Sequence, residues 1–144
     1  MLNRQATAST VSLRTSKRAR AQIVMLLAQF LLGMGVNLIG LPSETSGVAR
    51  GVTVAALVGH VAIALGLTVG AILTVRLAAS TPGFAALAWS GLLLVVVTIA
   101  AGVLTMLLDS NWWSYLMAVG FAALLVVYGR LYLVAFRDGV RRAA

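Results

Sequence analysis

The side chain with the widest chemical range in this sequence is a histidine inside an apolar stretch. His60 is the only histidine of the chain, and it lies in a run of 24 residues without a charge, from Val52 to Val75. An imidazole can bind a metal, carry a proton or form a hydrogen bond, and an ionisable group inside a membrane span is a candidate for function by default. Its chemistry depends on the groups that it can reach.

Two amides and a glycine recur at four-residue steps in the preceding apolar stretch. Gln29, Gly33 and Asn37 therefore lie on one face of a helix. Counted inward from the outer ends of the two helices, Gly33 and His60 fall at a similar depth of roughly 12 Å. The sequence predicts a polar cluster of these four residues. In it a neutral imidazole hydrogen-bonds to the first helix and ties two helices together.

Catalytic groups of other kinds are scarce. The chain has no cysteine, and none of its apolar segments contains a carboxylate. Thiol chemistry and paired-acid catalysis therefore have no residues to carry them inside these segments. A single histidine does not form a metal-ligand cluster, so His60 is a metal ligand only if a haem is bound. We predict no catalytic residue.

Four apolar segments hold these residues. They cover about residues 21–41, 52–75, 84–108 and 113–136, and each reaches the roughly 20 residues that a helix needs to cross a bilayer. Hydrophobic residues make up 61% of the 144 positions and charged residues 10%, which no water-exposed globular surface of this size could accommodate. The sequence predicts an all-α polytopic membrane protein, a four-transmembrane-helix bundle of two antiparallel hairpins.

Small residues mark the faces on which these helices should pack. Gly59, Gly66 and Gly70 lie on one face of the second segment, and Gly102 lies in a small and polar stripe of the third. Glycine lets helix backbones approach closely in a membrane. We therefore predict helix contacts at these four glycines.

Aromatic residues at the two ends of the fourth segment resemble the belts that lie at membrane interfaces. Trp112, Trp113 and Tyr115 stand at its start, and Tyr128 and Tyr132 stand near its end. The expectation is that both groups face the lipid headgroups.

The basic residues predict the orientation. Five lie in residues 1–20, one is Arg76, and four lie from Arg130 onward, whereas the opposite side has Arg50 alone. Two of the three acids, Glu44 and Asp109, also lie on that opposite side. Because basic residues are retained in the cytoplasm, both termini should lie there.

The two ends of the chain are predicted to be tails. Residues 1–20 hold five basic residues, six serines and threonines and little apolar content, so we expect a disordered basic cytoplasmic tail. A secretory signal peptide is the competing interpretation, but the apolar run that follows is too long for a signal core, which favours a retained first helix. Residues 137–144 are expected to form a short basic cytoplasmic tail.

The net charge of +8 does not indicate nucleic-acid binding, because the basic residues lie at helix ends and in tails rather than along a groove. Arginine outnumbers lysine ten to one, and alanine, valine and glycine are abundant. This composition favours a GC-rich bacterial genome. The expected location is the bacterial cytoplasmic (inner) membrane.

Residues 22 to 76 resemble one four-helix half of the haem A synthase family. The resemblance is carried by Gln29 followed by Leu32 and Gly33 in the first helix, an outer loop, and His60 in the second helix. It implies that His60 ligates a b-type haem. A second ligand within one chain would be Met34 or Met117, and otherwise two copies would each supply a histidine.

Two functions therefore follow from the sequence. The first is a small integral membrane protein without a cofactor that serves as a non-catalytic accessory or interaction subunit. Its surroundings would be the lipid bilayer, and its assembly a homo-oligomer or a larger membrane complex. The alternative is a b-type haem-binding membrane protein related to half-size haem A synthases.

Overall fold

The computed structural model describes residues 2–108 and 111–143, and these residues form four helices. The helices are α1 (Leu2–Ile39), α2 (Gly47–Ala78), α3 (Pro82–Leu108) and α4 (Asn111–Ala143). All four are long and apolar enough to cross a membrane. The prediction of an all-α protein with four helices of membrane-spanning length is therefore confirmed. Residues 109 and 110, between the third and fourth predicted segments, lie outside the described residues.

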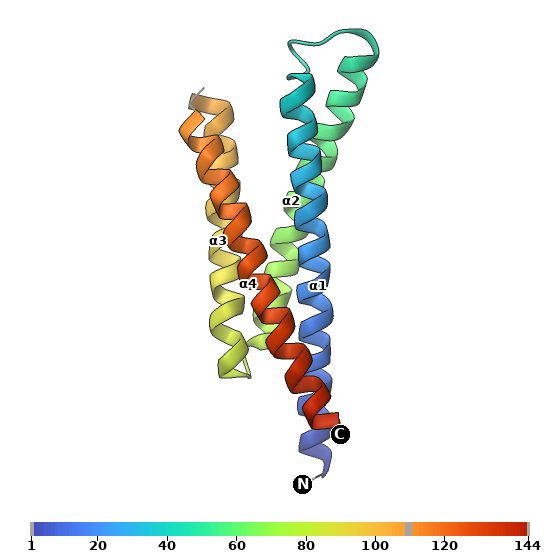
Figure 1. The fold of residues 1–144 in the computed structure, drawn as a ribbon, viewed down its shortest axis with the longest axis vertical. Coiled ribbons are helices and arrows are strands. Elements are labelled where there is room, and N and C mark those ends of the chain that lie inside the picture. The colour runs from blue at the N-terminus through green and yellow to red at the C-terminus, as the bar shows by residue number, and fades with distance from the viewer. Residues whose placement is uncertain (1, 109–110, 144) are drawn as a thin grey trace.

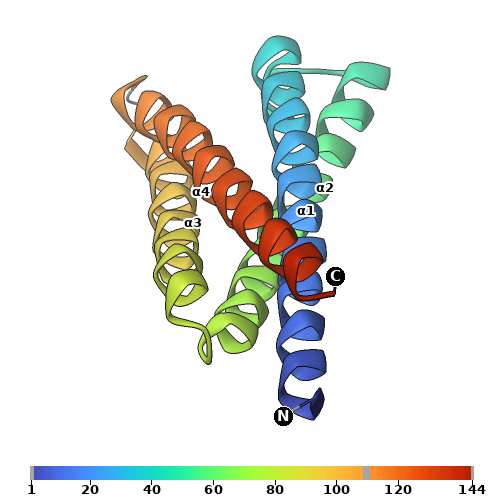
Figure 2. The ribbon, with the colours of Figure 1, turned by 60° about the horizontal axis from the view of Figure 1, so that its bottom comes forward.

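Consecutive helices pack against each other, and α1 also packs against α4 (Figure 1). The first and last turns of the described chain lie at the same end of the molecule, called here the terminal end. The opposite end, called here the loop end, holds the connection between α1 and α2. Figure 2 shows that α3 and α4 diverge from α1 and α2 toward the loop end.

A glycine and a proline end α1 at the loop to α2. α1 ends at Ile39 because Gly40 takes a left-handed conformation with φ of 101° and Pro42 follows two residues later. In the same loop the Glu44 carboxylate accepts a hydrogen bond of 2.9 Å from the backbone N–H of Leu41. These local bonds satisfy backbone groups at the loop end.

Residues 2–20 differ from the disordered tail that the sequence led us to expect, because they continue α1 as a helix. The hydroxyl of Ser12 donates a hydrogen bond of 2.6 Å to Asp138 Oδ2, and Ser9 donates one of 3.3 Å to the carbonyl of Gly139. Asp138 also pairs with Arg142 at 2.8 Å. α4 likewise continues as a helix to Ala143, through the segment expected to be a short tail.

The best-packed part of the molecule lies toward the terminal end. In α1 the buried residues of the described chain lie in its first 26 positions: Ser12, Thr15, Ser16, Ala19, Gln22 and Leu26. Toward the loop end large apolar side chains are exposed instead, among them Leu38 (79%) and Val48 (85%). Apolar surface on this scale is typical of a protein that contacts lipid or other membrane proteins.

Tyr128 corrects one expectation from the aromatic pattern. Trp112 and Tyr115 are exposed, but Tyr128 is completely buried. Its ring packs over Gly91 of α3, where a Cβ atom would lie only 2.9 Å from Tyr128 Cζ. The sequence suggested an interface residue because Tyr128 lies near the end of the fourth apolar segment, whereas α4 continues to Ala143 and leaves Tyr128 inside the bundle.

Candidate functional site

His60 lies in a notch that a glycine opens in the neighbouring helix. The imidazole Cε1 is 3.1 Å and Nδ1 is 3.4 Å from the position that a Cβ atom on Gly33 would take. His60 is half-buried in the contact between α1 and α2. Any larger residue at position 33 would displace the ring, so the imidazole can lie here because residue 33 is a glycine.

One hydrogen bond fixes the orientation of this ring. His60 Nδ1 is 3.2 Å from the backbone carbonyl oxygen of Gln29. A carbonyl oxygen can only accept, so the hydrogen of a neutral imidazole lies on Nδ1 and the lone pair lies on Nε2. The bond joins α2 to α1. Serine, threonine and amide side chains join membrane helices through hydrogen bonds of this kind, and here the imidazole does so.

The structure brings together only part of the predicted polar cluster. His60, Gly33 and the backbone of Gln29 meet, whereas Asn37 is exposed, and no hydrogen bond between described residues joins it to His60. The side-chain oxygen Oε1 of Gln29 is buried without a hydrogen-bond partner among the described residues. The contact to α1 therefore runs through the main chain rather than through the two amides.

A second polar contact between α1 and α2, at Gln22, was missed by the sequence reasoning. Its Nε2 donates a hydrogen bond of 3.1 Å to the carbonyl oxygen of Leu67, and the residue is 2% exposed. The amide lies directly over Gly70. The available signal was the spacing: Gln22 precedes Gln29 by seven residues and so shares its helix face.

The predicted packing glycines all face large side chains of a neighbouring helix. On α2, a Cβ at Gly59 would lie 3.3 Å from Leu32 Cδ1, and one at Gly66 would lie 2.6 Å from Met25 Cε. On α3, a Cβ at Gly102 would lie 3.3 Å from Met117 Sδ. Together with Gly33 under His60 and Gly70 under Gln22, these contacts place side chains of one helix in glycine notches of the next.

The arrangement offers little for a second haem ligand. The sulfur of Met117 packs between α3 and α4, a different helix pair from the one that holds His60. Met34 is 40% exposed. Phe121 of α4 stacks on Phe30 of α1 with ring centroids 5.0 Å apart. Among the described residues no group of three histidine, cysteine, aspartate or glutamate side chains could hold a metal ion.

Comparison with known proteins does not assign the chain to a family. No protein-family model, curated protein or solved structure matches the chain. The resemblance of residues 22 to 76 to the haem A synthase family therefore stays a prediction. Chemically, the site can do two things: it can hold α1 and α2 together, and it can present the Nε2 lone pair of His60.

Proposed function

We propose that this protein is a small multi-pass protein of the bacterial inner membrane that acts as a non-catalytic accessory or interaction subunit. Its four helices form two antiparallel hairpins across the bilayer. The exposed apolar side chains toward the loop end and the spanning length of every helix support insertion. Lipid surrounds the bundle, and further copies or a larger membrane complex bind it.

The hydrogen bonds of the polar side chains support the non-catalytic part of this proposal. His60 bonds to a carbonyl of α1, and Gln22 of α1 bonds to a carbonyl of α2. Thr53, Thr68 and Thr74 of α2 bond to carbonyls four residues earlier in their own helix. These side chains hydrogen-bond to backbone carbonyls of their own helix or of the neighbouring helix, as expected of polar residues that stabilise a membrane bundle.

In the proposed orientation, the terminal end of the molecule lies in the cytoplasm. We expect periplasm-active reporter fusions to be active when joined after Ser46 and inactive when joined after Thr81 or after Ala143. The physical reason is the retention of ten of the eleven basic residues on one side. Alkaline phosphatase activity measured against fusion abundance checks this result.

A cytoplasm-active reporter at the same three positions gives the matched control, because its pattern of activity should be the inverse. An active phosphatase at the C-terminal fusion would contradict the proposed arrangement, in which both termini lie in the cytoplasm and the number of spans is even.

One observation favours the alternative function, a b-type haem protein. The Gln29 carbonyl holds Nδ1 of His60, and a histidine that ligates a metal through Nε2 commonly donates its other N–H to such a group. The same bond is equally suited to a structural role. An absorbance spectrum distinguishes the two functions.

We expect the purified protein to carry no stoichiometric haem, and the His60→Gln variant to keep most of the stability of the first hairpin. Glutamine can still donate a hydrogen bond to the Gln29 carbonyl, whereas His60→Leu leaves that carbonyl with one bond fewer. Loss of the bond should cost about 1 kcal/mol. Unfolding in detergent micelles, followed by circular dichroism, compares the two variants.

The spectrum is recorded on protein expressed with added haem precursor, so that supply does not limit loading. A Soret band that corresponds to one haem per chain and is lost in His60→Gln would establish the alternative in place of the accessory role.

A further inference from the structure

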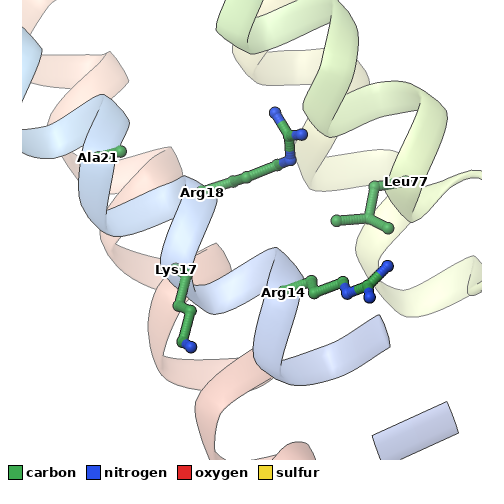
Figure 3. A pocket seen from close by; sticks show the side chains of 5 residues that line it. All are labelled: Arg14, Lys17, Arg18, Ala21 and Leu77. Carbon is green, nitrogen blue, oxygen red and sulfur yellow. The ribbon is translucent and has the colours of Figure 1, made fainter. Parts of the chain in front are cut away.

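A basic groove lies between α1 and α2 near the terminal end. It has a volume of about 470 Å³ and is lined by Arg14, Lys17, Arg18, Ala21 and Leu77. Figure 3 shows that Arg14 and Arg18 both extend from α1 toward the helix that carries Leu77, whereas Lys17 leaves α1 in a different direction. Two guanidinium groups, one helical turn apart, therefore reach into the same space.

The charges of this groove have no acidic partner in the described part of the chain. Asp138 pairs with Arg142 and accepts from Ser12, and Glu44 lies at the loop end. Of the five residues that line the groove, three are basic and none is acidic. The groove therefore has a local excess of positive charge, which favours an anion as its ligand.

The groove also lies where the chain changes from charged to apolar. On α1 the last basic residue is Arg20, and the next charged residue along the chain is Glu44, beyond the end of the helix. Arg14 and Arg18 thus lie on the polar side of this boundary, and Ala21 is the first residue past it. Leu77 of α2 adds a second apolar side chain to the lining, one residue beyond Arg76. A ligand that fills the groove should be charged at one end and apolar at the other.

We propose that this groove binds the phosphate group of an anionic membrane lipid, with the lipid's glycerol and acyl chains against Ala21 and Leu77. The proposal rests on the membrane insertion proposed above. Arginine forms bidentate hydrogen bonds with phosphate oxygens, and basic pockets between helices on the cytoplasmic side suit anionic headgroups. Free phosphate shares the charge but has nothing to place on the apolar side of the groove.

The test measures lipid binding to the full chain in detergent by native mass spectrometry. Dioleoylphosphatidylglycerol is compared with dioleoylphosphatidylcholine, which has the same acyl chains and no net charge, and with inorganic phosphate. The wild-type protein should bind the anionic lipid at least about tenfold more tightly than the zwitterionic one. The double variant Arg14→Gln/Arg18→Gln should lose this preference.

A matched control removes the same number of charges from the same end of the molecule. Arg20→Gln/Arg137→Gln replaces two exposed arginines that do not line the groove, and it should retain the preference. Arg14→Lys/Arg18→Lys keeps the charge but loses the planar fork, so its preference should be intermediate. Unchanged melting temperatures in phosphatidylcholine show that the variants are folded.

Three results would overturn the proposal. Equal loss in the control variant would show attraction to net charge rather than to the groove, and equal binding of both lipids by the wild type would show no site. Competition by inorganic phosphate at the concentration of the lipid would assign the groove to a soluble anion. A chain that does not fractionate with membranes would instead contradict the proposed insertion, so the two failures are distinct.

Discussion

Leucine in place of Gly91 should lower the free energy of unfolding in detergent by about 3 kcal/mol. The ring of Tyr128 lies over this glycine, and a Cβ would come within 2.9 Å of Cζ and 3.0 Å of the hydroxyl oxygen. Tyr128 is completely buried, so its rigid ring has no free space to enter. Denaturation by sodium dodecyl sulfate, followed by circular dichroism, measures the loss.

Gly83 provides the matched control in the same helix. Nothing lies within 4 Å of a Cβ at this position, and leucine favours a helix more than glycine does. Gly83→Leu should therefore leave stability unchanged or slightly higher. Similar losses in both variants would mean that the effect comes from the helix itself rather than from contact with α4.

A second-site change shows whether Gly91 and Tyr128 act as a pair. Tyr128→Ala alone should leave a cavity and cost about 3 to 5 kcal/mol. In the double variant the leucine occupies part of that cavity, so the combined loss should fall at least about 1 kcal/mol short of the sum of the single losses. Additive losses would show that the two sites do not share a contact.

The glycines of α2 should form a graded series under replacement by leucine. Gly70→Leu should cost about 3 kcal/mol, because it displaces the buried Gln22 amide from the Leu67 carbonyl and leaves the amide N–H without a partner. Gly66→Leu should cost about 1 to 2 kcal/mol, because the atom in its way is the end of the flexible Met25 side chain. Gly51→Leu should be neutral, since nothing lies within 4 Å.

The series is measured as the midpoint of unfolding for the three variants in one detergent at one protein concentration. Gln22→Leu combined with Gly70→Leu should not recover stability, since two leucines would then compete for one notch. A loss at Gly51 equal to that at Gly70 would place the contact surface of α2 on a different face from the one described here.

The sequence predicted the number of helices because length and apolar content are enough to recognise a bilayer span. It also predicted the contacts of Gly59, Gly66, Gly70 and Gly102, since small residues at helical spacing define a packing face. Hydropathy could not predict the helix ends. It marks the part of a helix that is apolar, whereas the backbone continues into polar sequence, as α1 does from Leu2.

The site was predictable in its depth but not in its bonds. Counting residues from the helix ends aligns His60 with Gly33, because both helices rise by the same distance per residue. The partner of the imidazole is a main-chain carbonyl, which every residue has and which no sequence pattern can mark. For the same reason the bond from Gln22 to Leu67 left no signal beyond the position of the amide.

Residues 9–16 show how a distant segment decides local structure. Their composition is polar and basic, which favours disorder in isolation. Leu13 nevertheless packs on Gly139, and Ser12 bonds to Asp138, more than 120 residues away. The helix there depends on α4, so a local pattern could not reveal it.

The pairing of α1 with α4, the most extensive in the bundle, joins the first and last helices of the chain. α1 is synthesised before α4, because α2 and α3 lie between them in the chain. Until α4 is made, the face of α1 that carries Phe30 and Leu13 lacks the partners that it has in the folded protein. The first hairpin must therefore persist on its own contacts, and Gln22, His60 and the α2 glycines supply them before the bundle can close.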